Sequence, residues 1–213
     1  MQLKDSLLNQ PLMIVGNGPS LNQTPLDELA HIFSIGMNKI DLIYPRVAWR
    51  PDLVLVSNNL VVKQHWKEIQ ASRIPSFISW KARWFLPSSQ RKNFQFFLTK
   101  DSSEFELEAD LGVGASGTIT FAALQFAYYM GANPVILVGV DHSFTFSGES
   151  HSYQLRKGPD VNHFDPNYFQ ENSLWGTPNL EASERGYRKA KDVFERQGRR
   201  IVDATVGGQL DIF

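Results

Sequence analysis

The sequence predicts an α/β fold: a Rossmann-like open, mostly parallel sheet flanked by helices. Short apolar runs without alternation recur along the chain, which is typical of strands buried on both faces of a parallel sheet. The first three runs lead into small or amide residues, as at a ligand-binding edge. A glycine-rich loop, a helical stretch and another apolar run then follow in the order of half a βαβ unit.

Length and composition narrow the functional classes. With 213 residues the chain is long enough for one sizeable core, so residues 1–213 are expected to form a single nucleotide-binding domain. The net charge of −1 gives no overall field that favours nucleic acid or an anionic membrane. The aromatic content of 12% suits a pocket, a dense core or an interface, so the composition is compatible with a homo-oligomer.

The absence of cysteine excludes a disulfide framework and thiolate metal ligands, and it fits a reducing compartment. The first residues lack the basic start and apolar run of a signal peptide. No apolar stretch reaches the roughly 18 residues that a membrane helix needs. We therefore expect a cytoplasmic protein without a membrane span.

The first half of the chain contains three predicted strands, at 12–15, 32–36 and 52–56. After the first strand we predict a helix with Thr24 as N-cap, Pro25 at its first position, and Asp27 and Glu28 in its first turn. Farther on, 61–71 favours a helix and 76–80 a strand. The aromatic stretch 81–97 is interpreted as an irregular insertion over one side of the core.

The second half contains the clearest helical segment, 119–130, with Gly131 as its left-handed stop. A strand at 135–140 follows, and a last helix and strand are predicted at 177–198 and 200–204. Residues 143–176 show no periodic pattern. A loop of this length is usually a functional lid or disordered, and its aromatic and charged side chains favour a lid-like loop.

The first candidate ligand turn is Gly16-Asn17-Gly18-Pro19-Ser20, directly after the first strand. A dinucleotide fingerprint would need a third glycine where Leu21 stands, which argues against an NAD site. Two glycines around an amide form a tight turn whose backbone N–H groups can face an anion or a sugar hydroxyl. The alternative is a plain strand-to-helix turn.

The second candidate turn precedes the helix at 119–130. Gly114 and Gly117 leave its backbone unobstructed, Ser116 and Thr118 bring hydroxyls, and the helix N-terminus offers unpaired N–H groups and partial positive charge. It is not a P-loop, because the Gly-Lys-Ser/Thr ending is missing. In the alternative, Ser116 serves only as the N-cap of the helix.

Further polar residues follow other strands. Asn38 and Asn58 could each bond a base or ribose edge, or stabilise their own turns. Gly139, Asp141 and His142 lie at the end of the strand at 135–140. Asp141 and His142 could bind a cation, hold a ribose or act as a base there.

Polar side chains of the lid-like loop could close on a phosphate; they are Tyr153, Arg156, Lys157, His163 and Tyr168. The alternative is a solvated loop with scattered charges. A transition-metal site has weak support because no His-x-x-x-His pair occurs, whereas magnesium needs few carboxylates.

Together these motifs resemble a known family. GNGPSL, the strand-end asparagines, GxSGTxT and VGVDHSF occur in the same order in the domain-of-unknown-function family 115 proteins, the 6-hydroxymethylpterin diphosphokinase MptE-like family. That family is related to the bacterial sialyltransferases of glycosyltransferase family 42. The segments NHFDPNYF and IVDATVGGQLDIF resemble the first group more than the second.

The resemblance implies a metal-independent transferase that takes a sugar from a cytidine-monophosphate (CMP) sugar to a hydroxyl of a glycan or small acceptor. In family 42 the first turn and the strand-end asparagines contact the nucleotide and donor sugar, which maps to Asn17, Gly18, Ser20, Asn38 and Asn58. The Ser-Gly of the second turn contacts cytidine, which maps to Ser116 and Gly117. The two lid tyrosines that steady the departing phosphate have unaligned counterparts in Tyr153 and Tyr168.

One departure concerns the general base. The family 42 histidine lies just before the last helix, where this chain has Trp175-Gly176-Thr177. His163 is therefore the first candidate and His142 the second, since the pKa of histidine suits removal of a hydroxyl proton near neutral pH. Arg156, Lys157 or the tyrosines would offset leaving-group charge.

Two other functions stay open at this stage. The family's diphosphokinase description implies a magnesium- and ATP-dependent enzyme in which Asp141 and Asp165 hold the metal. The missing histidine also allows a nucleotide-binding module without turnover.

Overall fold

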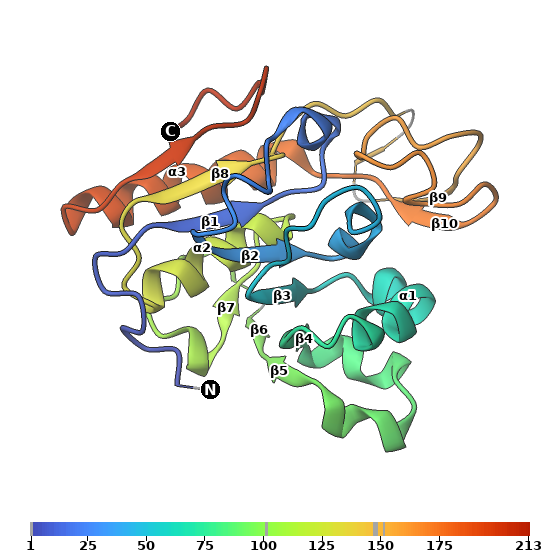
Figure 1. Cartoon of the computed structure of the whole chain (residues 1–213), viewed down its shortest axis with the longest axis horizontal. Helices are drawn as coiled ribbons and strands as arrows, with labels where there is room; N and C mark the ends of the chain where they lie inside the picture. Colours follow the sequence, from blue (N-terminus) through green and yellow to red (C-terminus); the bar gives the residue numbers. More distant parts are fainter. Residues whose placement is uncertain (1, 101, 147–148, 151) are drawn as a thin grey trace.

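The computed structural model describes residues 2–100, 102–146, 149–150 and 152–213. Its main strands are β1 (Leu12–Val15), β2 (Phe33–Met37), β3 (Leu53–Val56), β4 (Ser76–Ser79), β5 (Gln95–Phe97), β8 (Val135–Val138) and β11 (Ile201–Asp203). Within the described residues these form one seven-stranded sheet in the order β11-β8-β1-β2-β3-β4-β5. Every neighbouring pair is parallel, as Figure 1 shows, so the predicted open parallel sheet is confirmed.

Three α-helices of the described chain flank this sheet: α1 (Asn59–Ala71), α2 (Ile119–Tyr129) and α3 (Leu180–Arg196). Short 3₁₀ helices connect the strands; they are η1 (Pro19–Gln23), η2 (Ile40–Ile43), η3 (Trp80–Phe85), η4 (Ser88–Asn93) and η5 (Ala109–Leu111). Two small strand pairs lie outside the sheet: parallel β6 (Thr99–Lys100) with β7 (Val113–Gly114), and antiparallel β9 (Tyr153–Leu155) with β10 (Leu174–Gly176).

The strand order reverses at β1. From β1 the chain builds outward through β2 to β5, and it later returns to place β8 and then β11 on the other side of β1. The carboxyl ends of β1 and β8 therefore form a topological switch point. Ligands of open α/β sheets bind beyond the strands at this point.

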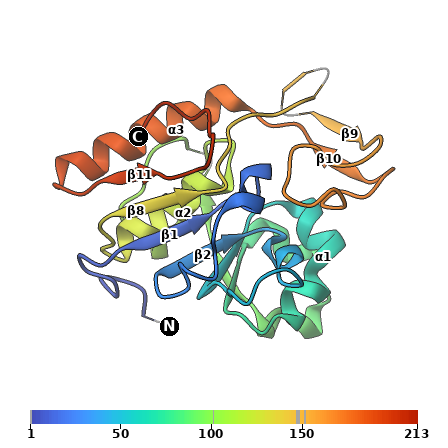
Figure 2. The ribbon, with the colours of Figure 1, turned by 45° about the horizontal axis from the view of Figure 1, so that its top comes forward.

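Apolar layers cover both faces of the central strands. Leu12 and Ile14 of β1 pack into the layer that contains α2 and α3, whereas Met13 and Val15 pack into the layer that contains α1. Figures 1 and 2 show α2 and α3 together on the same side of the sheet. All four β1 side chains are fully buried, which explains why this strand is an unbroken apolar run.

The helix predicted from Thr24 is absent. Thr24 ends η1, and residues 25–31 form turns. The Asp27 carboxylate accepts the Trp49 N–H at 2.7 Å, so the acidic residue assigned to a helix N-terminus makes a tertiary contact instead.

Two stretches interpreted as irregular contain strands. Within 81–97, η3 and η4 lead into β5, which pairs with β4 at the edge of the sheet. The lid-like loop 143–176 contains the β9–β10 pair, and its residues 147, 148 and 151 lie outside the described residues. Strands of three residues are too short for a periodic pattern to reveal. None of the helices in the described ranges has the length and apolar character required to cross a bilayer.

Candidate functional site

A cavity of about 550 Å³ lies at the carboxyl edge of the sheet, beside the switch point. Residues 16–18 after β1 and residues 114–118 before α2 both line it, so the two turns converge on one space. The other sequence-predicted residues along its wall are Asn38, Asn58, Gly139, Asp141, His142, Tyr153, His163 and Tyr168. Ser20, Arg156 and Asp165 do not line it.

Three backbone N–H groups of the first turn donate to acceptors inside the protein. Gly16 N–H donates to Val138 O at 2.8 Å, and Gly18 N–H donates to Gly139 O at 2.9 Å. Ser20 N–H donates to Asp141 Oδ1 at 2.9 Å. This differs from the expectation that these groups face an anion, because each already has an acceptor.

The same turn is pressed against the end of β8. A Cβ on Gly16 would lie 2.2 Å from the carbonyl oxygen of Gly139, and a Cβ on Gly18 would lie 1.8 Å from Asp141 Oδ2. Ser20 Oγ donates to that Oδ2 at 2.6 Å. The two glycines thus permit close contact with the protein itself, and Asp141 fastens the first turn to β8.

Residues 116–118 of the second turn differ from the first turn in this respect. Within the described part of the chain, no hydrogen bond leaves the N–H groups of Ser116, Gly117 or Thr118. Thr118 is the N-cap of α2, since its Oγ1 accepts the Thr120 N–H at 3.2 Å. Ser116 is therefore not the cap, and its hydroxyl donates to the Ala182 carbonyl. Residues 116–118 and the N-terminal turn of α2, which carries partial positive charge, line the cavity.

The Gln125 side chain anchors the second turn through Gly114, and no sequence motif predicted this contact. Its Oε1 accepts the Gly114 N–H at 2.7 Å, and its Nε2 donates to the Gly114 carbonyl at 3.1 Å. The side chain is fully buried. A buried amide between apolar neighbours in a helix is the one signal in the sequence that marks it.

The asparagines divide between structural and unassigned roles. Asn58 Oδ1 accepts the N–H groups of Leu60 and Val61 at 2.8 and 3.4 Å, so it caps α1 and stabilises its own turn. Asn17 Nδ2 donates to the Met37 carbonyl at 2.9 Å. The Oδ1 atoms of Asn17 and Asn38 are buried without a hydrogen-bond partner among the described residues.

His163 and Asp160 form a pair at the cavity. His163 Nδ1 lies 2.9 Å from Asp160 Oδ2, and the Asp160 side chain is only 1% exposed. Asp160 Oδ1 also accepts the Asn162 N–H at 2.9 Å. Burial by itself raises the pKa of Asp160, but the hydrogen bond and charge of His163, the Asn162 N–H and Arg156 outweigh it and lower that pKa. The carboxyl is thus held ionised behind the imidazole.

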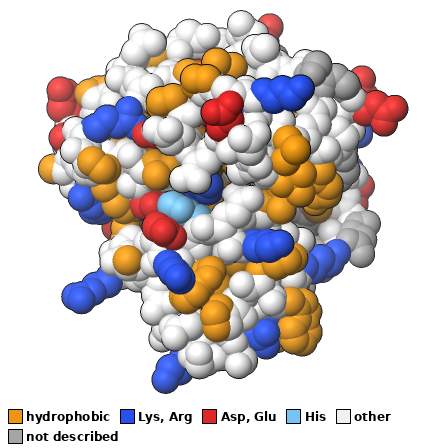
Figure 3. Space-filling model, turned by 90° about the vertical axis from the view of Figure 1, so that its right-hand side faces the viewer, with side chains coloured by type: hydrophobic (Ala, Val, Ile, Leu, Met, Phe, Trp, Pro, Cys, Tyr) orange, Lys and Arg blue, Asp and Glu red, His pale blue; other side chains and the backbone are white. Residues whose placement is uncertain are grey.

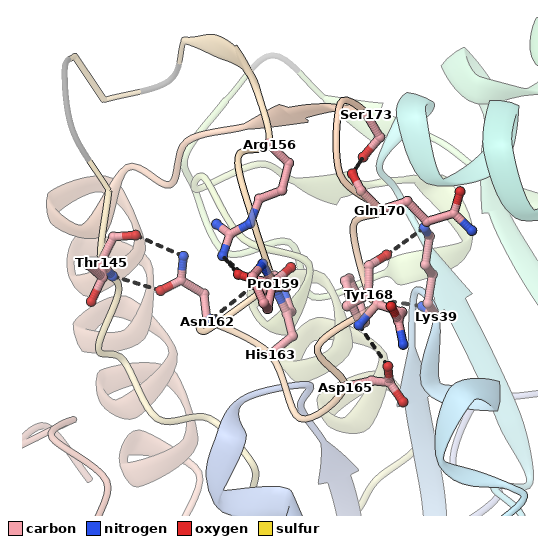
Figure 4. Close-up of polar contacts among 12 residues, drawn as sticks. Lys39, Thr145, Arg156, Pro159, Asn162, His163, Asp165, Tyr168, Gln170 and Ser173 are labelled. Atoms are coloured by element: carbon pink, nitrogen blue, oxygen red, sulfur yellow. Dashed lines mark hydrogen bonds and ion pairs between the residues drawn. The ribbon is translucent and has the colours of Figure 1, made fainter.

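Tyr168 supports the His163 ring. The two rings stack with centroids 3.9 Å apart and planes 2° apart. The Tyr168 hydroxyl accepts the Lys39 N–H at 3.3 Å, and Lys39 Nζ donates to the Tyr168 carbonyl at 2.7 Å, as Figure 4 shows for the ammonium contact. Burial raises the pKa of Tyr168, so its phenol stays neutral. This tyrosine positions the histidine and joins the lid-like loop to the end of β2.

The remaining catalytic candidates occupy different places. Tyr153 is 67% exposed on β9 at the cavity wall. His142 Nε2 lies 3.1 Å from Glu184 Oε1, which makes a second histidine–carboxylate pair at the wall. Arg156, predicted to offset leaving-group charge, is outside the cavity. Its guanidinium donates to the Pro159 carbonyl and lies 3.6 Å from Asp160, as Figure 4 shows for Pro159.

The carboxylates assigned to magnesium are not brought together on the cavity. Asp165 lies outside the wall and pairs with Arg46 at 3.5 Å. Both Asp141 oxygens accept hydrogen bonds from Ser20. Across the described ranges, no group of three His, Asp or Glu side chains is arranged to hold a metal ion. The predicted pair of Asp141 and Asp165 therefore does not form a two-carboxylate site.

Comparison with known proteins identifies the family. The model of the family described as 6-hydroxymethylpterin diphosphokinase MptE-like matches residues 1–147. No curated protein matches the chain. Among solved structures, the MAf glycosyltransferase from Magnetospirillum magneticum AMB-1 is similar, with a TM-score of 0.59 and 14% identity.

That similarity covers 98% of this chain and 34% of the glycosyltransferase, so this chain spans about a third of its neighbour's length. At 14% identity the likeness shows a shared fold. The family match is more extensive in sequence, since it includes 147 of the 213 residues and both turns at the cavity. The chain belongs to the MptE-like family, as its ordered motifs predicted.

Proposed function

We propose that this protein is a glycosyltransferase that moves a sugar from a nucleotide donor to an acceptor hydroxyl. The observation that carries the proposal is that one cavity is lined by residues 116–118, whose backbone N–H groups have no partner among the described residues, and by His163, which pairs with Asp160. The fold shared with the MAf glycosyltransferase over 98% of the chain supports it. The choice of a CMP-sugar rests on the resemblance to the family 42 sialyltransferases.

The second turn is the proposed phosphate site. The N–H groups of Ser116, Gly117 and Thr118 would donate to the phosphate, and the N-terminus of α2 adds partial positive charge. These groups also stabilise the negative charge that develops on the phosphate as the bond to the sugar breaks. No protein-bound metal is needed for this step.

His163 is the proposed general base. Asp160 would accept a hydrogen bond from Nδ1–H, which leaves Nε2 as the basic nitrogen of the neutral ring. The acceptor hydroxyl gives its proton to Nε2 while its oxygen bonds to the anomeric carbon. The bond from that carbon to the phosphate oxygen breaks, and the nucleotide monophosphate leaves with the electron pair.

A magnesium-dependent diphosphokinase is the second candidate, because the family description names that activity. Asp141 is a carboxylate on the cavity wall and would hold the ion together with the phosphates of ATP, since Mg²⁺ commonly uses one or two protein carboxylates. The engagement of both Asp141 oxygens with Ser20 favours the glycosyltransferase.

Nucleotide titration of the thermal midpoint separates the two candidates. We expect CMP to raise the midpoint without magnesium, because a ligand that binds only the folded state at about 100 times its Kd adds about 2.7 kcal/mol of stability. Stabilisation by ATP alone, and only with magnesium present, would favour the diphosphokinase and contradict the proposal.

The rate of turnover in a His163 variant tests the role of His163 as general base. With a CMP-sugar donor, His163→Asn should lower the rate of CMP release by about 10²–10⁴-fold, because a general base contributes a factor of that size. The rise in thermal midpoint that CMP produces should match the rise in the wild type, because His163 does not belong to the proposed phosphate site; the midpoint without CMP should fall, because buried Asp160 loses its partner. His31→Asn, at an exposed histidine outside the cavity, is the control. Binding of CMP without turnover in the wild type would indicate a non-catalytic module instead.

A further inference from the structure

Positive charge is concentrated in one part of this nearly neutral chain. Residues 69–100 contain six basic side chains and no acidic one, against a net charge of −1 for all 213 residues. The whole-chain average therefore conceals a strongly basic segment. This segment includes η3 and η4, at the edge of the sheet beside β5.

Exposed aromatic rings lie among these charges. We call this surface the aromatic–basic patch; it consists of Trp80, Arg83, Trp84, Phe85, Arg91 and Lys92. Trp84 is 65% exposed, Trp80 44% and Phe85 40%. The lowest part of the face in Figure 3 shows hydrophobic and basic side chains side by side, below the region where acidic ones appear.

The patch is held together by stacked cations and rings. The Arg83 guanidinium lies 3.8 Å from the ring centre of Trp80 and 4.1 Å from that of Trp84. Arg91 lies 4.9 Å from the Trp84 ring. The Trp80 ring also packs edge to face on the Phe96 ring, with the ring centroids 5.7 Å apart, and this contact anchors the patch to β5. The rings are thus fixed at the surface by packing.

This chemistry fits the interface of an anionic membrane. Tryptophan and phenylalanine enter the headgroup region, while arginine and lysine bind lipid phosphates. Guanidinium groups already lie on the Trp80 and Trp84 rings, which leaves less ring face for stacking with a base or a sugar. The absence of acidic residues from 69–100 matches a negatively charged partner surface.

We infer that the aromatic–basic patch docks the protein on an anionic membrane surface. Ser79 and Lys81, on either side of Trp80, line the cavity, so docking brings the cavity mouth close to the lipid headgroups. This inference goes beyond the proposed transferase activity and does not depend on it, since docking needs no donor or acceptor.

Co-sedimentation of the full chain with vesicles tests the inference. We expect binding to phosphatidylcholine vesicles that contain about 30% phosphatidylserine, and much weaker binding to phosphatidylcholine alone. Arg83→Gln with Lys92→Gln should weaken binding about 25-fold, as about fivefold for each charge removed. Trp84→Ser with Phe85→Ser should weaken it about tenfold or more, because two apolar anchors are lost.

Matched controls remove equivalent groups elsewhere. Arg185→Gln with Arg196→Gln on the exposed side of α3, and Val206→Ser at an exposed apolar position, should leave vesicle binding within about twofold of the wild type. The thermal midpoint of each variant reports folding. Raising salt from about 0.1 to 0.5 M should weaken wild-type binding, which tests the charge component without any substitution.

Three results would overturn the inference. The first is equal binding of the wild type to neutral and anionic vesicles. The second is binding of the patch variants as strong as that of the wild type. The third is binding of the protein to an oligothymidine or to polyglutamate and to no vesicle. The last result would assign the patch to a nucleic acid or an acidic protein. None of the three affects the nucleotide titration or the turnover test.

Discussion

At the scale of single residues, the candidate site depends on Asp160, the partner of His163. It fixes His163 through Nδ1 while lying almost wholly buried. In the sequence, this pair is visible only as an acidic residue three positions before a histidine. A spacing of three brings side chains together only in a suitable turn, so the sequence alone could not distinguish this pair from neighbours in an open loop.

The lowered pKa of Asp160 gives a pH prediction. The unfolded carboxyl titrates at its ordinary value of 3.8, and the folded one titrates below it. The ionised group therefore stabilises the fold fully above about pH 4, and this stabilisation is lost as pH falls through the folded pKa. Asp160→Asn should cost about 1–3 kcal/mol near neutral pH, and the cost should shrink toward about pH 2.

Urea unfolding of both proteins across this pH range measures that cost. Asp110→Asn, at an exposed carboxyl distant from His163 in the sequence, is the control and should change stability by less than about 0.5 kcal/mol at every pH. A constant difference between Asp160→Asn and the wild type from neutral to acid pH would contradict the assigned role.

At the scale of elements, the first turn acts as a joint between β1 and β8. The three N–H groups that it donates and the Asp141 clamp lock the ends of two adjacent strands. Asn58 likewise caps α1. Residues that the sequence marked for ligand contact thus carry much of the local structure, because polar groups at strand ends must find partners whether or not a ligand binds.

Gly16→Ala tests the joint. The added Cβ would lie 2.2 Å from a backbone oxygen of Gly139, which cannot move without separating β1 from β8. We expect a loss of about 2–4 kcal/mol in unfolding free energy. Gly176→Ala is the matched control, because its Cβ would meet only Tyr153 ring atoms at 3.7 Å or more. Equal stabilities for the two variants in urea unfolding would show that the joint tolerates displacement.

At the scale of the whole molecule, part of the lid-like loop is core. Phe164, Tyr168, Phe169 and Trp175 are buried in the same apolar layer as Met13 and Val15 of β1. A loop that only closed over a ligand would not carry four aromatic rings in this layer. The segment therefore packs as part of the core, and its Tyr168, Phe169 and Trp175 also line the cavity.

Phe164→Ala should cost about 3–5 kcal/mol in unfolding free energy, the usual loss for a phenylalanine removed from a core. Val161→Ala, three residues earlier and 60% exposed, should cost less than about 0.5 kcal/mol. Thermal or urea unfolding measures both. A cost below about 1 kcal/mol for Phe164→Ala would mean that the segment opens readily from the sheet.

The sequence by itself determined the sheet, the family and the place of the first glycine turn at the carboxyl edge; that the second turn, which follows β7 outside this sheet, lies on the same cavity depends on the tertiary structure. Buried parallel strands are unbroken apolar runs, and parallel strands bring their carboxyl ends to one edge, so these features follow from local patterns. The prediction of a helix from Thr24 was wrong, and so was the interpretation of residues 81–97 as irregular throughout. In both segments tertiary contacts outweigh local propensity.

Only the tertiary structure decided which polar groups face the cavity. The first turn and the second turn are alike in sequence, yet the backbone N–H groups of Gly16, Gly18 and Ser20 donate within the protein, whereas those of residues 116–118 have no acceptor among the described residues. The partner of each N–H group is a residue more than a hundred positions away, at the end of β8. A contact at that sequence separation depends on strand order, and no local pattern of residues records strand order.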